Sequence, residues 1–199
     1  AFAVAWSPNA RRLAASFASG LLQVWDLTTQ GMIPTIGVTN EVQAVRDLDW
    51  SPDGHWLLVA GYPGLVRIWR PETQETLWTF RGHSNGLASA TWNPDGQRVA
   101  SKDFSGRVLI WEASTGKVLR ELKCPAGHNS PNKGHQVVWS PRGDRLAAGG
   151  GDGTVMVWDG TTGREIHALK GHTSNVRSLS WSPDGQRLAS AGEDRTIRL

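Results

Sequence analysis

The chain has 199 residues, of which 39% are hydrophobic and 20% charged, and its net charge is +3. This composition is that of a globular protein rather than a disordered one, and no apolar run approaches the ~20 residues of a membrane span. Basic residues are scattered along the chain, whereas a nucleic-acid-binding protein concentrates them on a stripe or tail.

Cysteine content and the first residues bear on the cellular compartment. Cys124 is the single cysteine, and the chain has no Asn-x-Ser/Thr glycosylation site. The first twelve residues lack the basic start and the apolar stretch of a signal peptide. We therefore expect a reducing, cytoplasmic location and no disulfide framework.

Tryptophan marks a repeat that runs from the first residues to the last. Trp followed by Ser or Asn and then Pro begins at residues 6, 50, 92, 139 and 181. A second Trp, preceded by an apolar residue, follows the first four of these at residues 25, 69, 111 and 158. The chain therefore divides into five units, at about 1–37, 38–81, 82–122, 123–170 and 171–199.

Each unit has the pattern of short strands joined by tight turns. In the first unit we expect strands at about 2–6, 12–18 and 21–26. Pro-Asp-Gly turns recur at 52–54, 94–96 and 183–185. Proline presets the backbone of such a turn and glycine accepts positive φ. Later units repeat apolar stretches at 56–60, 98–101, 145–149 and 187–190, alternating runs at 65–69, 107–111 and 154–158, and amphipathic runs at 117–122 and 164–169.

Four such strands form an antiparallel sheet with two apolar faces. Sheets of this kind stack face to face around an axis, as blades of a β-propeller. A Trp at the same place in each unit fills the gap between neighbouring blades. We expect an all-β fold, nearly without helix, in which Trp25, Trp69, Trp111 and Trp158 are each largely buried.

The motifs resemble those of the WD-repeat propellers over essentially the whole chain. The matching segments are Gly-His, then Trp-Ser-Pro-Asp-Gly, then Asp-Gly-Thr-Val-Met-Val-Trp-Asp at 152–159. The resemblance implies four full blades and three strands of a fifth, because the chain begins at a first strand and ends within a third. It also implies a larger closed ring of about seven blades, completed by the same longer chain or by another copy.

The resemblance further implies a hydrogen-bond network of His, Ser/Thr, Asp and Trp in each unit. The matching residues are His83, Ser101 and Trp111 in the third unit, Asp152 and Trp158 in the fourth, and His172, Ser190 and Asp194 in the fifth. Other units depart from the pattern. Ser105 stands where the turn Asp is expected, Ala148 replaces the Ser/Thr, and Asn40-Glu41 replaces Gly-His. The turns of the first two units carry Ser19 and Pro63 instead of Asp, so packing is expected to hold the earlier blades.

Motifs with catalytic or metal chemistry each have a simpler structural interpretation. Gly82-His83-Ser84-Asn85-Gly86 matches a nucleophile elbow, but it lies between strands, with no helix to follow. Cys124, His128 and His135 share one loop, yet three ligands at irregular spacing make a poor zinc site. Asp47 and Asp49 share one face of a strand, and solvated charges are favoured over an acid–base pair. We therefore expect no catalytic residue, no cofactor and no metal.

Aromatic residues point to a binding surface instead. Tyr62 and Phe104 fall in the turns between the second and third strands of adjacent units, next to Lys102 and Asp103. Glu193 holds a similar place in the fifth unit. Exposed aromatic side chains in neighbouring loops are typical of interface hot spots. These five residues are the predicted partner-binding patch, and the alternative is that the rings fold back over the blade edges.

Two functions fit the sequence. The favoured one is a non-enzymatic interaction scaffold or sensor that binds proteins or peptides through this loop face, without a membrane or nucleic-acid partner. The alternative is an accessory propeller that gates a hydrolase domain, as in the Tol-type and prolyl-peptidase propellers, which share the Ser-Pro-Asp-Gly turns. The Gly-His pairs and third-strand Trp residues favour the first.

Overall fold

A computed structural model gives the structure of the chain, and it describes residues 3–17, 21–35, 41–42, 44–126 and 136–199. The described residues form nineteen strands and no helix, so the expected all-β class is confirmed. Within these residues there is accordingly no helix able to cross a membrane.

The strands form four four-stranded sheets and one three-stranded sheet. The first two sheets are β1(Ala3–Trp6), β2(Arg12–Ser16), β3(Leu22–Asp26) and β4(Gly31–Ile33), then β5(Ala44–Trp50), β6(Leu57–Tyr62), β7(Leu65–Arg70) and β8(Glu75–Phe80). The third and fourth are β9(Leu87–Trp92), β10(Arg98–Asp103), β11(Arg107–Glu112) and β12(Val118–Lys123), then β13(Val137–Trp139), β14(Arg145–Gly149), β15(Val155–Asp159) and β16(Glu165–Leu169). The last is β17(Val176–Trp181), β18(Leu188–Gly192) and β19(Ile197–Arg198).

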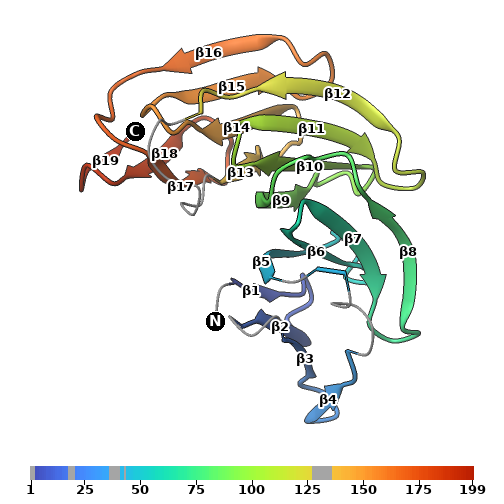
Figure 1. Cartoon of the computed structure of the whole chain (residues 1–199). Coiled ribbons are helices and arrows are strands. Elements are labelled where there is room, and N and C mark those ends of the chain that lie inside the picture. The colour runs from blue at the N-terminus through green and yellow to red at the C-terminus, as the bar shows by residue number, and fades with distance from the viewer. Residues whose placement is uncertain (1–2, 18–20, 36–40, 43, 127–135) are drawn as a thin grey trace.

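Each sheet pairs its strands antiparallel in chain order, and the sheets follow one another along an open arc (Figure 1). The first strand of each sheet lies on the inner side of the arc and the fourth strand on the outer side. Turns between second and third strands therefore open on one face, which we call the loop face. Turns between first and second strands open on the other, which we call the opposite face.

The Pro-Asp-Gly turns form for the reason expected from sequence. Gly54, Gly96 and Gly185 have φ of 73°, 69° and 70°, in the left-handed region that a side chain disfavours. The amide of Gly54 donates to the carbonyl of Ser51 at 2.8 Å, and this bond closes the turn.

The hydrophobic core is divided into layers between adjacent sheets. Trp69 packs with residues of the first sheet, Trp111 with the second and Trp158 with the third. All three are at most 3% exposed, as expected. Trp25 is half-buried, so it is covered less completely than the other three. A third-strand Trp packs against the preceding sheet. Because β1–β4 is the first sheet that the structure describes, Trp25 has no preceding sheet against it.

Candidate functional site

The predicted network in the third sheet is present and complete. His83 Nδ1 lies 3.0 Å from Asp103 Oδ2, and His83 Nε2 lies 2.8 Å from Ser101 Oγ. The indole N–H of Trp111 donates to Ser101 Oγ at 3.3 Å. Since an ionised carboxylate only accepts, Nδ1 carries the proton and Nε2 accepts from the Ser101 hydroxyl. The network therefore links the loop before β9 to β10 and β11.

Asp103 supplies the carboxylate of this network, so the expectation that the third unit lacks it is wrong. Ser101 and Asp103 are two residues apart on β10, and their side chains therefore share a face. Asp103 Oδ1 also accepts from the backbone N–H groups of Ser105 and Arg107 at 2.9 and 3.0 Å. Burial raises the pKa of Asp103, but the hydrogen bonds from His83 and Ser105 lower it further, so the pKa lies below its usual value.

The other sheets keep the network only in part. In the fifth, His172 Nε2 lies 2.9 Å from Ser190 Oγ and Nδ1 lies 2.9 Å from Asp194 Oδ2, as expected. In the fourth, Asp152 accepts from the backbone and hydroxyl of Thr154, and His128 lies outside the described residues. Neither bond of Asp152 reaches Trp158.

An ion pair occupies the corresponding place in the second sheet. Glu41 accepts from Arg67 Nη2 and from Arg81 Nη2, both at 2.6 Å. Arg67 is buried on β7 and also donates through Nε to Thr79 at 3.1 Å. Packing is therefore not the sole support of this sheet, because a charged pair joins the loop before β5 to β7.

Asp47 and Asp49 are not solvated charges, contrary to the expectation from sequence. Both are partly buried and reach from β5 across to β9. Asp47 Oδ2 accepts from the N–H of Ala90 at 3.0 Å, and Asp49 Oδ2 accepts from the N–H of Trp92 at 2.8 Å. Burial raises the pKa of each carboxyl to about 6, although these hydrogen bonds oppose the shift. The two carboxylates tie together neighbouring innermost strands.

Replacing Asp49 with asparagine is expected to stabilise the chain only at neutral pH. The folded pKa lies above the unfolded value of ~3.9, so the folded state binds more protons between pH 4 and 6. The free energy of unfolding therefore falls as pH rises through that window. Asparagine does not ionise, so it avoids this loss, and its side-chain oxygen still accepts the hydrogen bond from the Trp92 N–H. We expect a gain of about 1–2 kcal/mol at pH 7 and none below pH 4. Urea unfolding at pH 4 to 7 measures both, and a gain independent of pH would contradict the prediction.

Only part of the candidate metal motif lies within the described residues, whereas the candidate nucleophile motif is described in full. Cys124 is buried, burial raises its thiol pKa to about 11, and Sγ lies 3.7 Å from the carbonyl of Ala148. His128 and His135 lie outside the described residues, which contain no cluster of three metal-binding side chains. Ser84 lies in the loop before β9, and a strand rather than a helix follows it.

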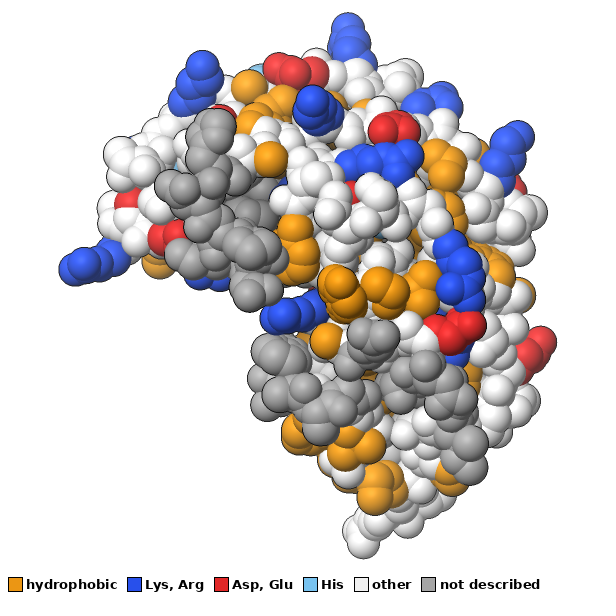
Figure 2. Space-filling view, in the orientation of Figure 1, with side chains coloured by type: hydrophobic (Ala, Val, Ile, Leu, Met, Phe, Trp, Pro, Cys, Tyr) orange, Lys and Arg blue, Asp and Glu red, His pale blue; other side chains and the backbone are white. Residues whose placement is uncertain are grey.

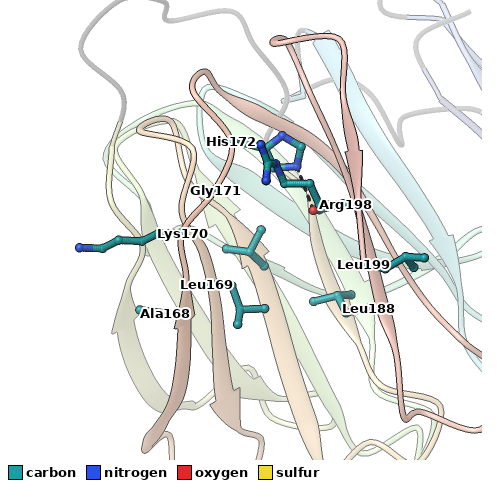
Figure 3. A pocket seen from close by; sticks show the side chains of 10 residues that line it. Ala168, Leu169, Lys170, Gly171, His172, Leu188, Arg198 and Leu199 are labelled. Atoms are coloured by element: carbon teal, nitrogen blue, oxygen red, sulfur yellow. Dashed lines mark hydrogen bonds between the residues drawn. The ribbon is translucent and has the colours of Figure 1, made fainter.

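A cavity of about 350 Å³ lies between β16 and the last sheet (Figure 3). His172 and Ser190 line it, joined by the hydrogen bond drawn there, together with Val155 and Leu188. Ser101 and His83 hold the same place beside Trp111 in the third sheet. The cavity therefore lies where the third-strand Trp packs in the third sheet.

Tyr62 and Phe104 come together on the loop face. A Cβ atom placed on Gly86 would lie 2.9 Å from Tyr62 Cδ2 and 3.5 Å from Phe104 Cδ2, so both rings contact this glycine. Tyr62 is 53% exposed, while Phe104 is half-buried. Figure 2 shows hydrophobic side chains gathered in the middle of one face, close to where β7 and β9 lie in Figure 1. We call Tyr62, Gly86 and Phe104 the aromatic patch.

Two residues assigned to the patch from sequence are not at the surface. Lys102 is 1% exposed and Asp103 is 0% exposed, so neither can contact a partner from the loop face. Lys102 alternates with Ser101 along β10 and points toward the fourth sheet, near Cys124. Burial lowers the pKa of Lys102 to about 8, although Cys124 and Asp103 oppose the shift.

Glu193 belongs to a separate cluster in the fifth sheet. Its carboxylate accepts from Asn175 Nδ2 at 2.8 Å and pairs with Arg177. Because the fourth sheet stands between it and Phe104, Glu193 does not extend the aromatic patch. Gly86 is the patch residue that sequence reasoning missed, since it was considered only as part of a nucleophile motif.

Comparison with known proteins decides the family. The model of the WD domain, G-beta repeat, matches residues 37–70, 74–112, 116–159 and 163–199. The chain belongs to the WD40-repeat family. These matches cover most of the chain and the same third-strand Trp positions that the structure buries between sheets.

Curated relatives resemble part of this WD40 chain. The Peroxisomal targeting signal 2 receptor of Mus musculus is 35% identical over 91 residues, which are 44% of this chain and 28% of that protein. Histone-binding protein MSI1 of Saccharomyces cerevisiae is 33% identical over 81 residues, 40% of this chain and 19% of the relative. Protein transport protein sec31 of Schizosaccharomyces pombe is 34% identical over 87 residues, 41% and 7% respectively. The chain thus spans less than a third of the length of these relatives.

Proposed function

We propose that this chain is a non-enzymatic interaction module that binds a protein or peptide through the aromatic patch. The observation that carries the proposal is the contact of Tyr62 and Phe104 with one glycine on the loop face, where Tyr62 leaves half its surface exposed. Two aromatic rings presented by separate turns offer a large apolar contact at small entropic cost.

Membership of the WD40 family supports the proposed class of function. Two of the relatives are named for what they bind: a peroxisomal targeting signal in one case and a histone in the other. Both ligands are proteins or parts of proteins, and we extend only that class to this chain. The scattered basic residues favour the same class over nucleic acid.

The test uses peptides selected on the chain itself. A displayed library of random twelve-residue peptides is panned on the 199-residue chain, and the affinities of selected peptides are measured by calorimetry. Tyr62→Ala and Phe104→Ala are each expected to weaken binding by about 1–3 kcal/mol, the magnitude of a hot-spot residue. Tyr62→Ala should change the free energy of unfolding by less than ~0.5 kcal/mol, because the side chain is exposed.

Met32 provides the matched control. It is an apolar side chain on β4 that is 59% exposed, and β4 belongs to a different sheet from Tyr62 and Phe104. Met32→Ala should leave affinity unchanged. Peptides that bind Tyr62→Ala and Phe104→Ala as tightly as the unaltered chain would place the binding surface elsewhere.

A further inference from the structure

A second groove lies on the opposite face, between the second and third sheets. Its volume is about 340 Å³, and its walls include two indoles and two aliphatic side chains next to a carboxylate: Trp56, Trp92, Leu77, Ala113 and Asp53. It opens beside the turns that join β5 to β6 and β9 to β10. The aromatic patch is on the other face, so the two sites are separate.

The groove coincides with a departure from the repeat. The residue six positions after the first Trp of each unit is Arg12, Arg98, Arg145 and Arg187 in four units. In the second unit it is Trp56. The chain's own guanidinium is therefore missing from this one position.

We call the contact between two adjacent sheets a junction. The junction between the third and fourth sheets shows what that guanidinium does. Arg98 reaches from β10 to the fourth sheet, where Nη1 donates to the carbonyl of Gly160 at 2.7 Å and Nη2 to that of Gly143 at 3.3 Å. Its guanidinium carbon lies 5.2 Å from the ring centroid of Trp139, and Asp95 accepts from Nη2 at 2.8 Å. A guanidinium is thus held over an indole by carbonyl groups and a carboxylate.

The same partners recur around the groove without that guanidinium. When the third and fourth units are aligned on their tryptophans, Trp92 corresponds to Trp139, Gly96 to Gly143 and Ala113 to Gly160. Trp92, Gly96 and Ala113 all line the groove. The Ala113 carbonyl already accepts from Trp78 Nε1 at 2.7 Å. The Gly96 carbonyl accepts no hydrogen bond from the residues that the structure describes.

Asp53 adds a negative charge at the rim. It is exposed, and its Oδ1 atom accepts from the N–H of His55 at 3.0 Å. Asp53 Oδ2 accepts no hydrogen bond from the residues that the structure describes. The guanidinium of Arg70 lies 4.4 Å from the ring centroid of Trp56, and Trp56 is more exposed than Trp92, which is 7% exposed.

We propose that this groove binds an arginine side chain from a partner protein. The arginine would lie against Trp56 and the small accessible part of Trp92, donate to the Gly96 carbonyl and pair with Asp53, much as Arg98 does between the third and fourth sheets. A guanidinium suits these partners better than an ammonium because it is planar, stacks on aromatic faces and carries donors in a fixed fork. This proposal does not depend on the aromatic patch.

The test is a titration of the isotope-labelled 199-residue chain with the blocked tripeptide acetyl-Gly-Arg-Gly-amide, followed by nuclear magnetic resonance. Shifts of the indole N–H signals of Trp56 and Trp92 should give a Kd in the millimolar range, since one side chain supplies the contact. The same tripeptide with citrulline, which keeps the shape and loses the charge, should bind at least fivefold more weakly.

Two variants test the role of the guanidinium: one adds it to the groove, and the other removes it from the next junction. Trp56→Arg restores the residue of the other four units, so the chain's own guanidinium should fill the groove and weaken tripeptide binding at least tenfold. Arg98→Ala is the matched opposite: it empties the next junction and should create a second set of shifts, at the indole of Trp139. Asp53→Asn should weaken binding about threefold and should keep the fold, because Asp53 is exposed.

The results that overturn the proposal are specific. Equal affinity for the arginine and citrulline tripeptides would remove the charge argument. Unchanged affinity in both Trp56→Arg and Asp53→Asn would place the tripeptide outside the groove. Binding that is instead lost in Tyr62→Ala would assign the tripeptide to the aromatic patch, whereas failure of that patch alone leaves this proposal intact.

Discussion

Replacing Trp111 with alanine is expected to lower the free energy of unfolding by about 3–5 kcal/mol. Its side chain is fully buried between the second and third sheets. Its ring lies 4.2 Å from that of Trp78 and is stacked on Phe80 at 5.1 Å, measured between centroids. Alanine would leave a cavity that these rings cannot fill, and it would remove the indole donor to Ser101. Urea unfolding followed by circular dichroism measures the loss.

Trp6 is the matched control for this prediction. It is 55% exposed, whereas Trp50, Trp92 and Trp139 hold the same repeat position and are at most 7% exposed. Trp6→Ala therefore removes the same atoms but only about half of the buried surface, and we expect a smaller change, about 1–2 kcal/mol, in the 199-residue chain. Equal losses in the two variants would contradict the view that packing between sheets is what the repeated tryptophans supply.

Replacing Asp103 with alanine is expected to cost about 2–4 kcal/mol. The carboxylate is buried and accepts from His83 and from the backbone of Ser105 and Arg107. Alanine would leave these donors without an acceptor, and the buried His83 donor would carry the largest desolvation cost. The loss is measured by urea unfolding at pH 7.

The pH dependence gives a second, independent check on Asp103. Its folded pKa is depressed, so the stabilisation is fully present above the unfolded value of ~3.9 and is lost as pH falls through the lower folded pKa. The difference between Asp103→Ala and the unaltered chain should therefore shrink below pH 4.

Ser105→Ala serves as the control for the same network. Ser105 occupies the position where the repeat leads one to expect the turn aspartate, but it does no more than donate to Asp103 at 2.6 Å. We expect its loss to cost about 1 kcal/mol or less. A larger loss in the free energy of unfolding for Ser105→Ala than for Asp103→Ala would show that Ser105, the residue at the expected turn position, is the more important one.

The position of each site residue shows where sequence reasoning reached its limit. Turn positions in the sequence predict the pair Tyr62 and Phe104, and the structure brings both rings close to Gly86. Proximity in sequence also predicts Lys102 and Asp103 on the same surface. Alternation along β10 instead turns Asp103 toward His83 and Lys102 toward the fourth sheet, where both are buried.

The amino-acid sequence by itself determined the period, the strands, the Pro-Asp-Gly turns and the buried third-strand tryptophans of the second to fourth sheets. These features are local: a tight turn needs its glycine, and alternation along a strand separates two faces within a few residues. Burial of a face depends on the sheet stacked against it, which is some 40 residues away in sequence. Only the tertiary structure therefore decided that Lys102 is buried, that Asp47 and Asp49 bind the neighbouring strand, and that Trp56 borders an open groove where Arg98 closes the next one.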